Sequence, residues 1–202
     1  LVSQTGDPQS VNKFDMIFAS NNHLYFAYSE QEAFAIYNIF LQKFDGDGNP
    51  VFTSPLSIVS DWMADKNVRA IDEIPNTGLI IVYDTESWMG SSVRAIAIDY
   101  DGNILSGWED GIGICSNSAN QQFKGIAKGS QGFYIVWKDY RGDGNDIYGQ
   151  MIDFEGNLLD NADGVPIAIE NSDQANPTIA YNESSSEMFV CWEDYRSGVY
   201  YD

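Results

Sequence analysis

The stretch from Gly132 to Leu158, GFYIVWKDYRGDGNDIYGQMIDFEGNL, decides how the rest of the chain is read. An apolar run ends at Trp137, a Gly- and Asn-rich loop follows, and a second apolar run ends before the turn at Gly156. This order is typical of two strands joined by a polar loop and closed by a tight turn. The stretch therefore predicts a β-meander.

The same pattern recurs along the chain with a period of 54 or 55 residues. The residues that close the apolar runs are Tyr28, Tyr83, Trp137 and Trp192. The glycines of the tight turns are Gly48, Gly102 and Gly156. The residues that open the preceding short strands are Phe14, Val68, Phe123 and Pro177. Three markers that share one period indicate a tandem structural repeat.

Each repeat holds four short apolar segments separated by turns, which predicts an all-β protein, a β-propeller with four-stranded antiparallel blades. The expected blades span residues 14–59, 68–115, 123–169 and 177–202, the last incomplete, and Leu1–Ser3 aligns with the final strand of a preceding blade. A closed propeller needs about four to eight blades, and the chain supplies about 3.5–4. We therefore expect one propeller segment over residues 1–202, as a fragment of a longer protein or of a ring completed by other chains.

Composition limits the possible partners. With 30 acidic and 10 basic residues the net charge is −20, which repels nucleic acid and anionic membrane surfaces. No apolar window is long enough to insert in a membrane, and the first residues do not have the features of a signal peptide. Cys115 and Cys191 each lie in an apolar run, which predicts two buried free thiols, with a disulfide between them as the alternative.

The third repeat carries a sharper motif, formed by Trp137, Asp139 and Arg141 and then by Asp146-Ile147-Tyr148 and Gly164-Val165-Pro166. It resembles the tandem repeats of about 54 residues in large secreted bacterial proteins, many of which carry a sorting tail for type IX secretion. The resemblance implies propeller-like, adhesin-like ectodomains at the cell surface and no particular activity. Trp192, Asp194 and Arg196 match it as well, whereas the first two repeats lack both the Trp and the Arg.

The Asp and Arg of this motif can be read in two ways. As a glycosidase site they would supply an acid and an electrophile. As repeat scaffolding, Asp139, Arg141, Asp194 and Arg196 would cap loop amides and pair between blades. Catalytic groups are normally unique in a ring, so their recurrence favours scaffolding, and we expect no catalytic residues in this chain.

Two clusters of oxygen-bearing side chains are candidates for calcium. They are Asp45, Asp47 and Asn49 in a turn, and Asp143, Asn145 and Asp146 in a loop. The position twelve residues into the first loop is Leu56 rather than Glu, and the turn recurs with Gly and Asn where a hairpin needs them, so a hairpin turn is favoured. His23 is the only histidine, which argues against a zinc or His-based site. We expect no cofactor, with structural calcium as the alternative.

Residues that break the repeat are better candidates for a specific function. Trp62-Met63 lies in the connection that enters the second repeat, and Trp88-Met89 lies between its second and third strands. In a propeller blade both connections belong to the same face of the ring, here beside Asp61, Asp65 and Glu86. Two Trp–Met pairs suit a binding patch for a sugar or an apolar protein segment, and the alternative is that they plug a local gap or cover a loop. Trp108, in a different connection, is expected in the core.

These observations favour a non-catalytic propeller segment that binds or displays at the surface of a bacterium. Its expected partners are an extracellular protein or glycan, and other blades of the same or another chain. The alternatives are a glycan-processing propeller enzyme whose site lies outside this segment, and a structural subunit of a multi-chain assembly.

Overall fold

The computed structural model describes residues 13–31, 36–60, 62–196 and 198, and the regular elements among them are all β-strands. No helix in this described part is long and apolar enough to cross a membrane. Leu1–Ser3, expected to form a strand, lies outside the described residues, as do residues 199–202 at the end of the fourth repeat.

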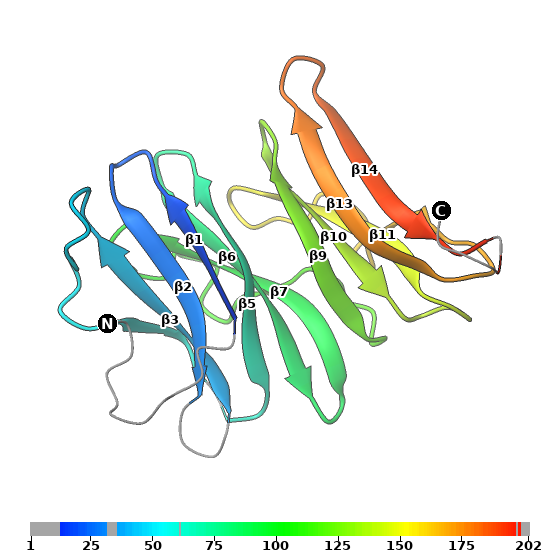
Figure 1. Cartoon of the computed structure of the whole chain (residues 1–202), viewed down its shortest axis with the longest axis horizontal. Coiled ribbons are helices and arrows are strands. Elements are labelled where there is room, and N and C mark those ends of the chain that lie inside the picture. Colours follow the sequence, from blue (N-terminus) through cyan, green and yellow to red (C-terminus); the bar gives the residue numbers. More distant parts are fainter. Residues whose placement is uncertain (1–12, 32–35, 61, 197, 199–202) are drawn as a thin grey trace. The chain divides into compact units, whose positions relative to one another are not determined.

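The strands form four sheets, one for each repeat, and the strands of each sheet pair in chain order (Figure 1). Sheet 1 contains β1 (Lys13–Phe18), β2 (Leu24–Gln31), β3 (Tyr37–Phe44) and β4 (Leu56–Val59). Sheet 2 contains β5 (Asp65–Ile74), β6 (Gly78–Ser87), β7 (Gly90–Asp99) and β8 (Ile112–Gly113). Sheet 3 contains β9 (Gln121–Lys128), β10 (Gly132–Asp139), β11 (Asp146–Asp153) and β12 (Val165–Ala168). Sheet 4 contains β13 (Gln174–Asn182) and β14 (Glu187–Asp194).

The all-β class and the four-stranded antiparallel meander predicted for each repeat are confirmed in sheets 1, 2 and 3. The last strand of the second repeat is short, since β8 covers only Ile112–Gly113 near the end of the expected blade 68–115. Gly111 has a φ of 65°, a left-handed conformation that interrupts extended backbone.

The hairpin turns after β3, β7 and β11 share one construction. Gly48, Gly102 and Gly156 have φ values of 83°, 86° and 97°, which only glycine adopts without strain. The residue that opens each turn is an aspartate whose carboxylate accepts the backbone N–H groups two and four residues later, at 2.7–3.0 Å. A repeated Asp, Gly and Asn therefore give a repeated, self-capped turn.

The chain divides into two compact units, residues 1–89 with 95–111, and residues 90–94 with 112–202. In the first unit β1 lies against β5, and one face of sheet 1 supplies polar contacts to sheet 2. The Ser29 hydroxyl accepts the Val68 N–H at 2.8 Å, and the Asp15 carboxylate accepts the Ile71 N–H at 3.0 Å. The Tyr25 hydroxyl, in a fully buried side chain, donates to the carbonyl that follows β7.

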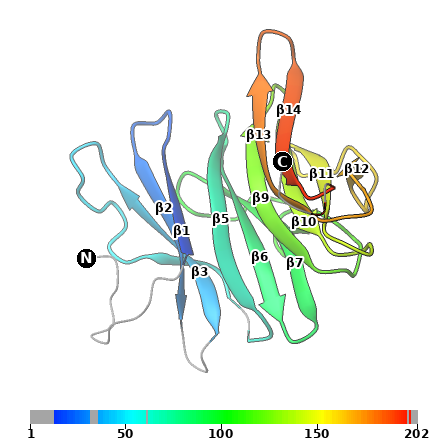
Figure 2. The same ribbon diagram turned by 45° about the vertical axis from the view of Figure 1, so that its right-hand side comes forward.

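In the second unit β13 runs beside β9 (Figures 1 and 2). The Tyr134 and Tyr181 rings stack with centroids 6.2 Å apart. Ile179 fills the space beside Gly125, where an added Cβ would come within 3.0 Å of the Ile179 side chain. A small residue on one sheet and a larger one on the next therefore set this contact.

Both cysteines are free, and Cys115 is buried as expected. The prediction that Cys191 is buried is wrong, because its side chain is exposed. On β14 the exposed residues are Glu187, Phe189, Cys191 and Glu193, every second position, and a strand sends alternate side chains to opposite faces. Trp108 is 1% exposed, which confirms its predicted place in the core.

Candidate functional site

The two Trp–Met pairs lie in connections at the same end of the β5–β6 hairpin. Trp62-Met63 precedes β5 and Trp88-Met89 follows β6. The register pairs Asp65 at the start of β5 with Glu86 near the end of β6. This ladder brings two segments about 25 residues apart in sequence to neighbouring positions.

A pocket of about 400 Å³ opens at this end of the hairpin. Its lining residues are Ile36, Met63, Ala64, Asp65, Glu86, Ser87 and Trp88. The structure thus brings Met63 of the first pair together with Trp88 of the second. Trp62 and Met89 are exposed beside them and do not line the pocket.

The side chains around this pocket are unusually exposed for their type. Trp88 is 92% exposed and Trp62 is 79% exposed, whereas Trp108 and Trp137 are buried. A connection that only fills a local gap would bury its large apolar side chains, so the exposure argues against that alternative.

Two carboxylates form the polar side of the pocket. Asp65 accepts the Tyr37 N–H at 3.0 Å through Oδ1. The Oε1 atom of Glu86 lies 3.3 Å from an Arg69 guanidinium nitrogen, and Arg69 is held more closely by Asp84 at 2.7 Å. These contacts fix the orientation of both carboxylates, while Glu86 remains half-exposed and able to accept further hydrogen bonds.

The sequence identified Met63, Trp88, Asp65 and Glu86, and it missed the other lining residues. Ile36 comes from the connection before β3, so no pattern within the second repeat points to it. Ala64 and Ser87 flank residues that were identified, and the hairpin register alone would have indicated them. Asp61, also expected here, lies outside the described residues.

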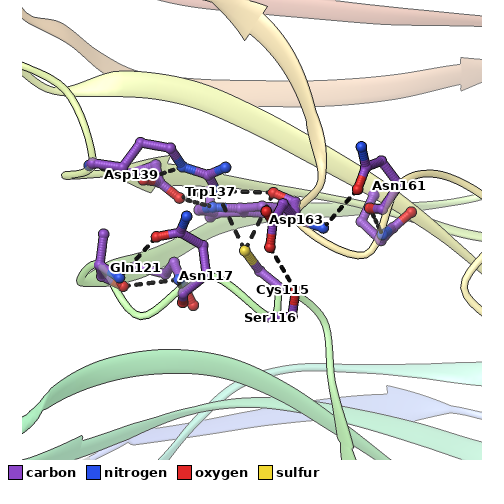
Figure 3. A network of polar contacts seen from close by, with 11 residues as sticks. Cys115, Ser116, Asn117, Gln121, Trp137, Asp139, Asn161 and Asp163 are labelled. Atoms are coloured by element: carbon purple, nitrogen blue, oxygen red, sulfur yellow. Dashed lines mark hydrogen bonds and ion pairs between the residues drawn. The ribbon is translucent and has the colours of Figure 1, made fainter.

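The Trp-x-Asp-x-Arg motif of the third repeat forms a separate, buried network (Figure 3). The Trp137 indole donates to Asp139 Oδ2 at 2.8 Å, and Arg141 donates to both oxygens of the same carboxylate at 2.7 and 2.8 Å. Asp139 Oδ1 also accepts the Arg141 backbone N–H at 3.0 Å. Asp139 is fully buried, so its charge is compensated at close range by Arg141.

The Arg141 guanidinium joins this network to two other connections. It donates to the Asp163 carbonyl at 2.9 Å and to the Cys115 sulfur at 3.3 Å. It also lies over the Tyr148 ring, 3.8 Å from the centroid. The hydrogen bond to Asp139 raises the pKa of Arg141, and burial raises the pKa of the Cys115 thiol. Both oxygens of the Asp139 carboxylate are hydrogen-bonded, and the arginine that binds them is itself held by further contacts. This carboxylate therefore has little freedom to act on a substrate.

In sheet 4 the same motif is more open. Asp194 Oδ1 accepts the Arg196 N–H at 2.9 Å, and Oδ2 lies 2.8 Å from Arg196 Nε. The Arg196 side chain is 61% exposed, against 17% for Arg141. Trp192 is half-buried.

Each motif faces a buried glutamine that the sequence reasoning missed. Gln121 pairs with Asp139 in the β9–β10 ladder, and Gln174 pairs with Asp194 in the β13–β14 ladder. Both are fully buried, and both donate through Nε2 to backbone carbonyls of the preceding connection. Their spacing of 53 residues, close to the repeat period, was the available signal.

The first calcium candidate is built as a turn. Asp45 accepts the backbone N–H groups of Asp47 and Asn49, and the Asn49 amide donates to both of its oxygens. These hydrogen bonds, the one from the Asn49 backbone first, lower the pKa of Asp45. Asp99 and Asp153 accept the equivalent backbone N–H groups in the other two turns, and the amides of Asn103 and Asn157 each donate to one of their oxygens. The Asp45 carboxylate thus already accepts hydrogen bonds from backbone N–H groups of its own turn.

The second candidate is arranged differently. Asn145 donates its backbone N–H and its side-chain amide to Asp173 Oδ1, both at 3.0 Å. Burial, and after it the charge of Asp139, raises the pKa of Asp146. Asp143 precedes them in the same loop. Among the described residues, no three His, Cys, Asp or Glu side chains are grouped as metal ligands, and His23 instead contacts the Asn21 carbonyl at 3.0 Å.

No protein-family model matches this sequence, and no curated protein matches it. Among solved structures, the chain is similar to the endo-arabinase from Bacteroides thetaiotaomicron VPI-5482, with a TM-score of 0.52 and 10% sequence identity. The match covers 91% of this chain and 70% of the endo-arabinase chain. At this identity the likeness concerns the fold alone. Together with the four repeated sheets, it shows that the chain has a β-propeller type of fold.

Proposed function

We propose that this chain is a non-catalytic propeller segment that binds a neutral glycan in the pocket between Met63 and Trp88. The observation that carries the proposal is the convergence of these two side chains from separate connections over Asp65 and Glu86. A pocket of about 400 Å³ lies within the range of small-ligand sites.

The chemistry of the pocket favours a sugar. An exposed indole offers a flat apolar surface for the C–H face of a pyranose or furanose ring. Oriented carboxylates accept hydrogen bonds from sugar hydroxyls. Because Asp65 and Glu86 are both acidic and the whole chain carries a charge of −20, anionic glycans are disfavoured.

On this proposal the protein acts outside a bacterial cell. The resemblance of its repeats to those of secreted surface proteins supports this location, and so does its acidic composition. It assigns no catalytic residue and no cofactor to this segment. The exposed Trp88 and Met63 would also suit an apolar peptide, and a site for a peptide alone would leave every sugar in the following titration unbound.

The test is titration of the 202-residue protein with neutral xylo-, manno-, cello- and arabino-oligosaccharides, followed by tryptophan fluorescence and calorimetry. We expect Trp88→Ala to weaken binding at least about fivefold, since truncating an aromatic anchor of a binding site costs about 1 kcal/mol or more. Tyr140→Ala, which removes another partly exposed aromatic, is the matched control and should bind normally. Failure of all four sugar series to bind, or equal binding by Trp88→Ala, would refute the proposal.

Two further measurements address the alternatives. Product analysis of each sugar after long incubation should show no cleavage, whereas hydrolysis that survives purification would indicate an enzyme. Binding and the melting temperature should be unchanged by EDTA. A fall in melting temperature with EDTA, reversed by Ca²⁺ and absent in Asp45→Asn, would instead assign a structural calcium to the first turn.

A further inference from the structure

Sheets 1 and 4 each have a face whose apolar side chains are exposed. On sheet 1 these are Phe14, Met16 and Phe18 of β1, which are 59%, 56% and 58% exposed. On sheet 4 the exposed side chains are Phe189, at 55%, and Cys191. Neither face belongs to the pocket described above. We call them the β1 face and the β14 face.

The strand register identifies the face of sheet 4 that is equivalent to the β1 face, and that face is covered. In sheet 1, Met16 pairs with Phe26, two residues before Tyr28, which closes the apolar run. The same position in sheet 4 is held by Ile179, which pairs with Val190, two residues before Trp192. Ile179 is not open to solvent in the same way, since it lies against Gly125 and lines a small apolar pocket with sheet 3. This face of a repeat is therefore covered by another sheet of the same kind.

The covering face, on the neighbouring sheet, can be identified by the same count from the residue that closes the apolar run. On sheet 3 the covering face carries Tyr134 and Val136, three and one residues before Trp137. On sheet 1 the residue three before Tyr28 is Tyr25, whose ring lies 6.1 Å from Tyr100 of the neighbouring sheet. An aromatic residue in this position is thus part of the sheet-to-sheet contact in both units.

The β14 face has the same features. Phe189 and Cys191 lie three and one residues before Trp192, and they pair with Ala180 and Thr178 on β13. In sheet 3 the corresponding pairs are Tyr134 with Ala127 and Val136 with Gly125. The β14 face therefore has the aromatic residue and the small partners of a covering face, and in the described residues it covers nothing.

We propose that the β14 face of one copy of this chain packs on the β1 face of a second copy. The contact continues between molecules the sheet packing that each unit already contains. By equivalence with Ile179 beside Gly125 and Val136, Met16 of one copy would lie beside Thr178 and Cys191 of the other. Because the two faces differ, the contact is head-to-tail and leads to a ring or a filament.

The equivalence gives a direct test through proximity. One protein carries Met16→Cys and Cys191→Ser, and the second carries Cys191 with an affinity tag of different mass. After mixing and treatment with a short bismaleimide, we expect a cross-linked pair joining residue 16 to Cys191, identified by peptide mass spectrometry. The control replaces Met16→Cys with Asp47→Cys, an exposed turn position on the same sheet, and should give at least tenfold less product.

Mass in solution provides the second readout. Light scattering of the reduced, unmodified protein should give multiples of 22.5 kDa that grow with concentration. Phe189→Asp changes an exposed residue, so it should leave the circular dichroism spectrum intact and return the protein to a monomer. A monomer at all concentrations, equal cross-linking in the Asp47→Cys control, or an oligomer unaffected by Phe189→Asp would overturn the proposal. Sugar binding at Trp88 is independent of each of these outcomes.

Discussion

Sheets 3 and 4 carry the same Trp-x-Asp-x-Arg motif in two different environments. In sheet 3 the carboxylate of Asp139 is fully buried, and Arg141 reaches Asp163 and Cys115 in neighbouring connections. In sheet 4 Asp194 is also buried, but the Arg196 side chain is 61% exposed, with a second carboxylate, Glu170, 3.9 Å away. In both copies the aspartate is buried and accepts the Arg backbone N–H, so the different exposure of the two arginines shows what the surroundings add.

The comparison indicates that the motif caps the chain locally and that its contribution to the free energy of unfolding depends on what covers it. Both copies close the chain after the strand by the same bond, from the Arg backbone N–H to the Asp carboxylate. Among the described residues, only in the sheet 3 copy does the guanidinium also hydrogen-bond to separate connections, at the Asp163 carbonyl and the Cys115 sulfur. Substitutions at matched positions should therefore have unequal effects.

The largest difference is expected at the aspartates. Asp139→Ala should lower the free energy of unfolding by about 3–5 kcal/mol, because it leaves a partly buried guanidinium and the Trp137 indole N–H without their acceptor. Asp194→Ala should cost about 1–2 kcal/mol, mostly from loss of the turn cap. Urea denaturation followed by circular dichroism measures both. Equal losses would mean that burial does not distinguish the two copies.

The arginines should show the next largest difference. Arg141→Met should cost about 2–4 kcal/mol, since Asp139 then keeps a buried charge without its cation. Arg196→Met should cost no more than about 1 kcal/mol because the Arg196 guanidinium is largely exposed, so solvent screens its attraction to Asp194. Raising the salt concentration should reduce the small Arg196 effect and leave the Arg141 effect in place. The opposite order of effects would contradict this account.

The tryptophans provide a finer test. Trp137→Phe keeps an aromatic ring but loses the indole donor to Asp139, and it should cost about 1–2 kcal/mol. Trp192→Phe, at a half-buried position, should cost less than about 1 kcal/mol. The Asp139→Ala background sharpens the test because it removes the acceptor of the indole N–H, so the Trp137 effect should shrink there in a double-mutant cycle. Additive effects would show that the indole and carboxylate do not interact energetically.

The smallest expected effect comes from Asp146, beside the sheet 3 network. Burial raises its pKa, with Asp139 adding to the shift and Arg141 opposing it. When the pKa of a carboxyl group is higher in the folded protein than in the unfolded chain, the folded protein loses stability as the pH rises from the unfolded pKa to the folded pKa. Asp146→Asn should therefore match or slightly exceed the stability of the parent at pH 7, and the difference should disappear below pH 4. Denaturation at both pH values checks the sign, and a loss of stability at pH 7 would show that the charged form is favoured.

Features set by residues close in sequence were predictable. Gly48, Gly102 and Gly156 marked the turns because their backbone conformation requires glycine, and the strands followed from the apolar runs between them. Contacts between segments far apart in sequence were not. Arg141 contacts atoms 22 and 26 positions away, in connections with no motif of their own.

The candidate site shows the same limit. Exposed Trp–Met pairs stood out because nothing in the other repeats corresponds to them, and hairpin register then placed Met63 near Trp88. Ile36 belongs to a different repeat and could not be found from register. For Cys191, an apolar run predicted burial, but which face of β14 is covered depends on packing rather than on the run itself.

The self-capped turns after β3, β7 and β11 have a consequence for how the protein folds. Each turn is closed by bonds spanning no more than five residues, and each strand pairs with its neighbour in the chain. Such hairpins form within microseconds and need no distant segment to be in place. During synthesis each repeat can thus acquire its meander as it leaves the ribosome, and the slow step is left to the docking of one finished sheet on the next.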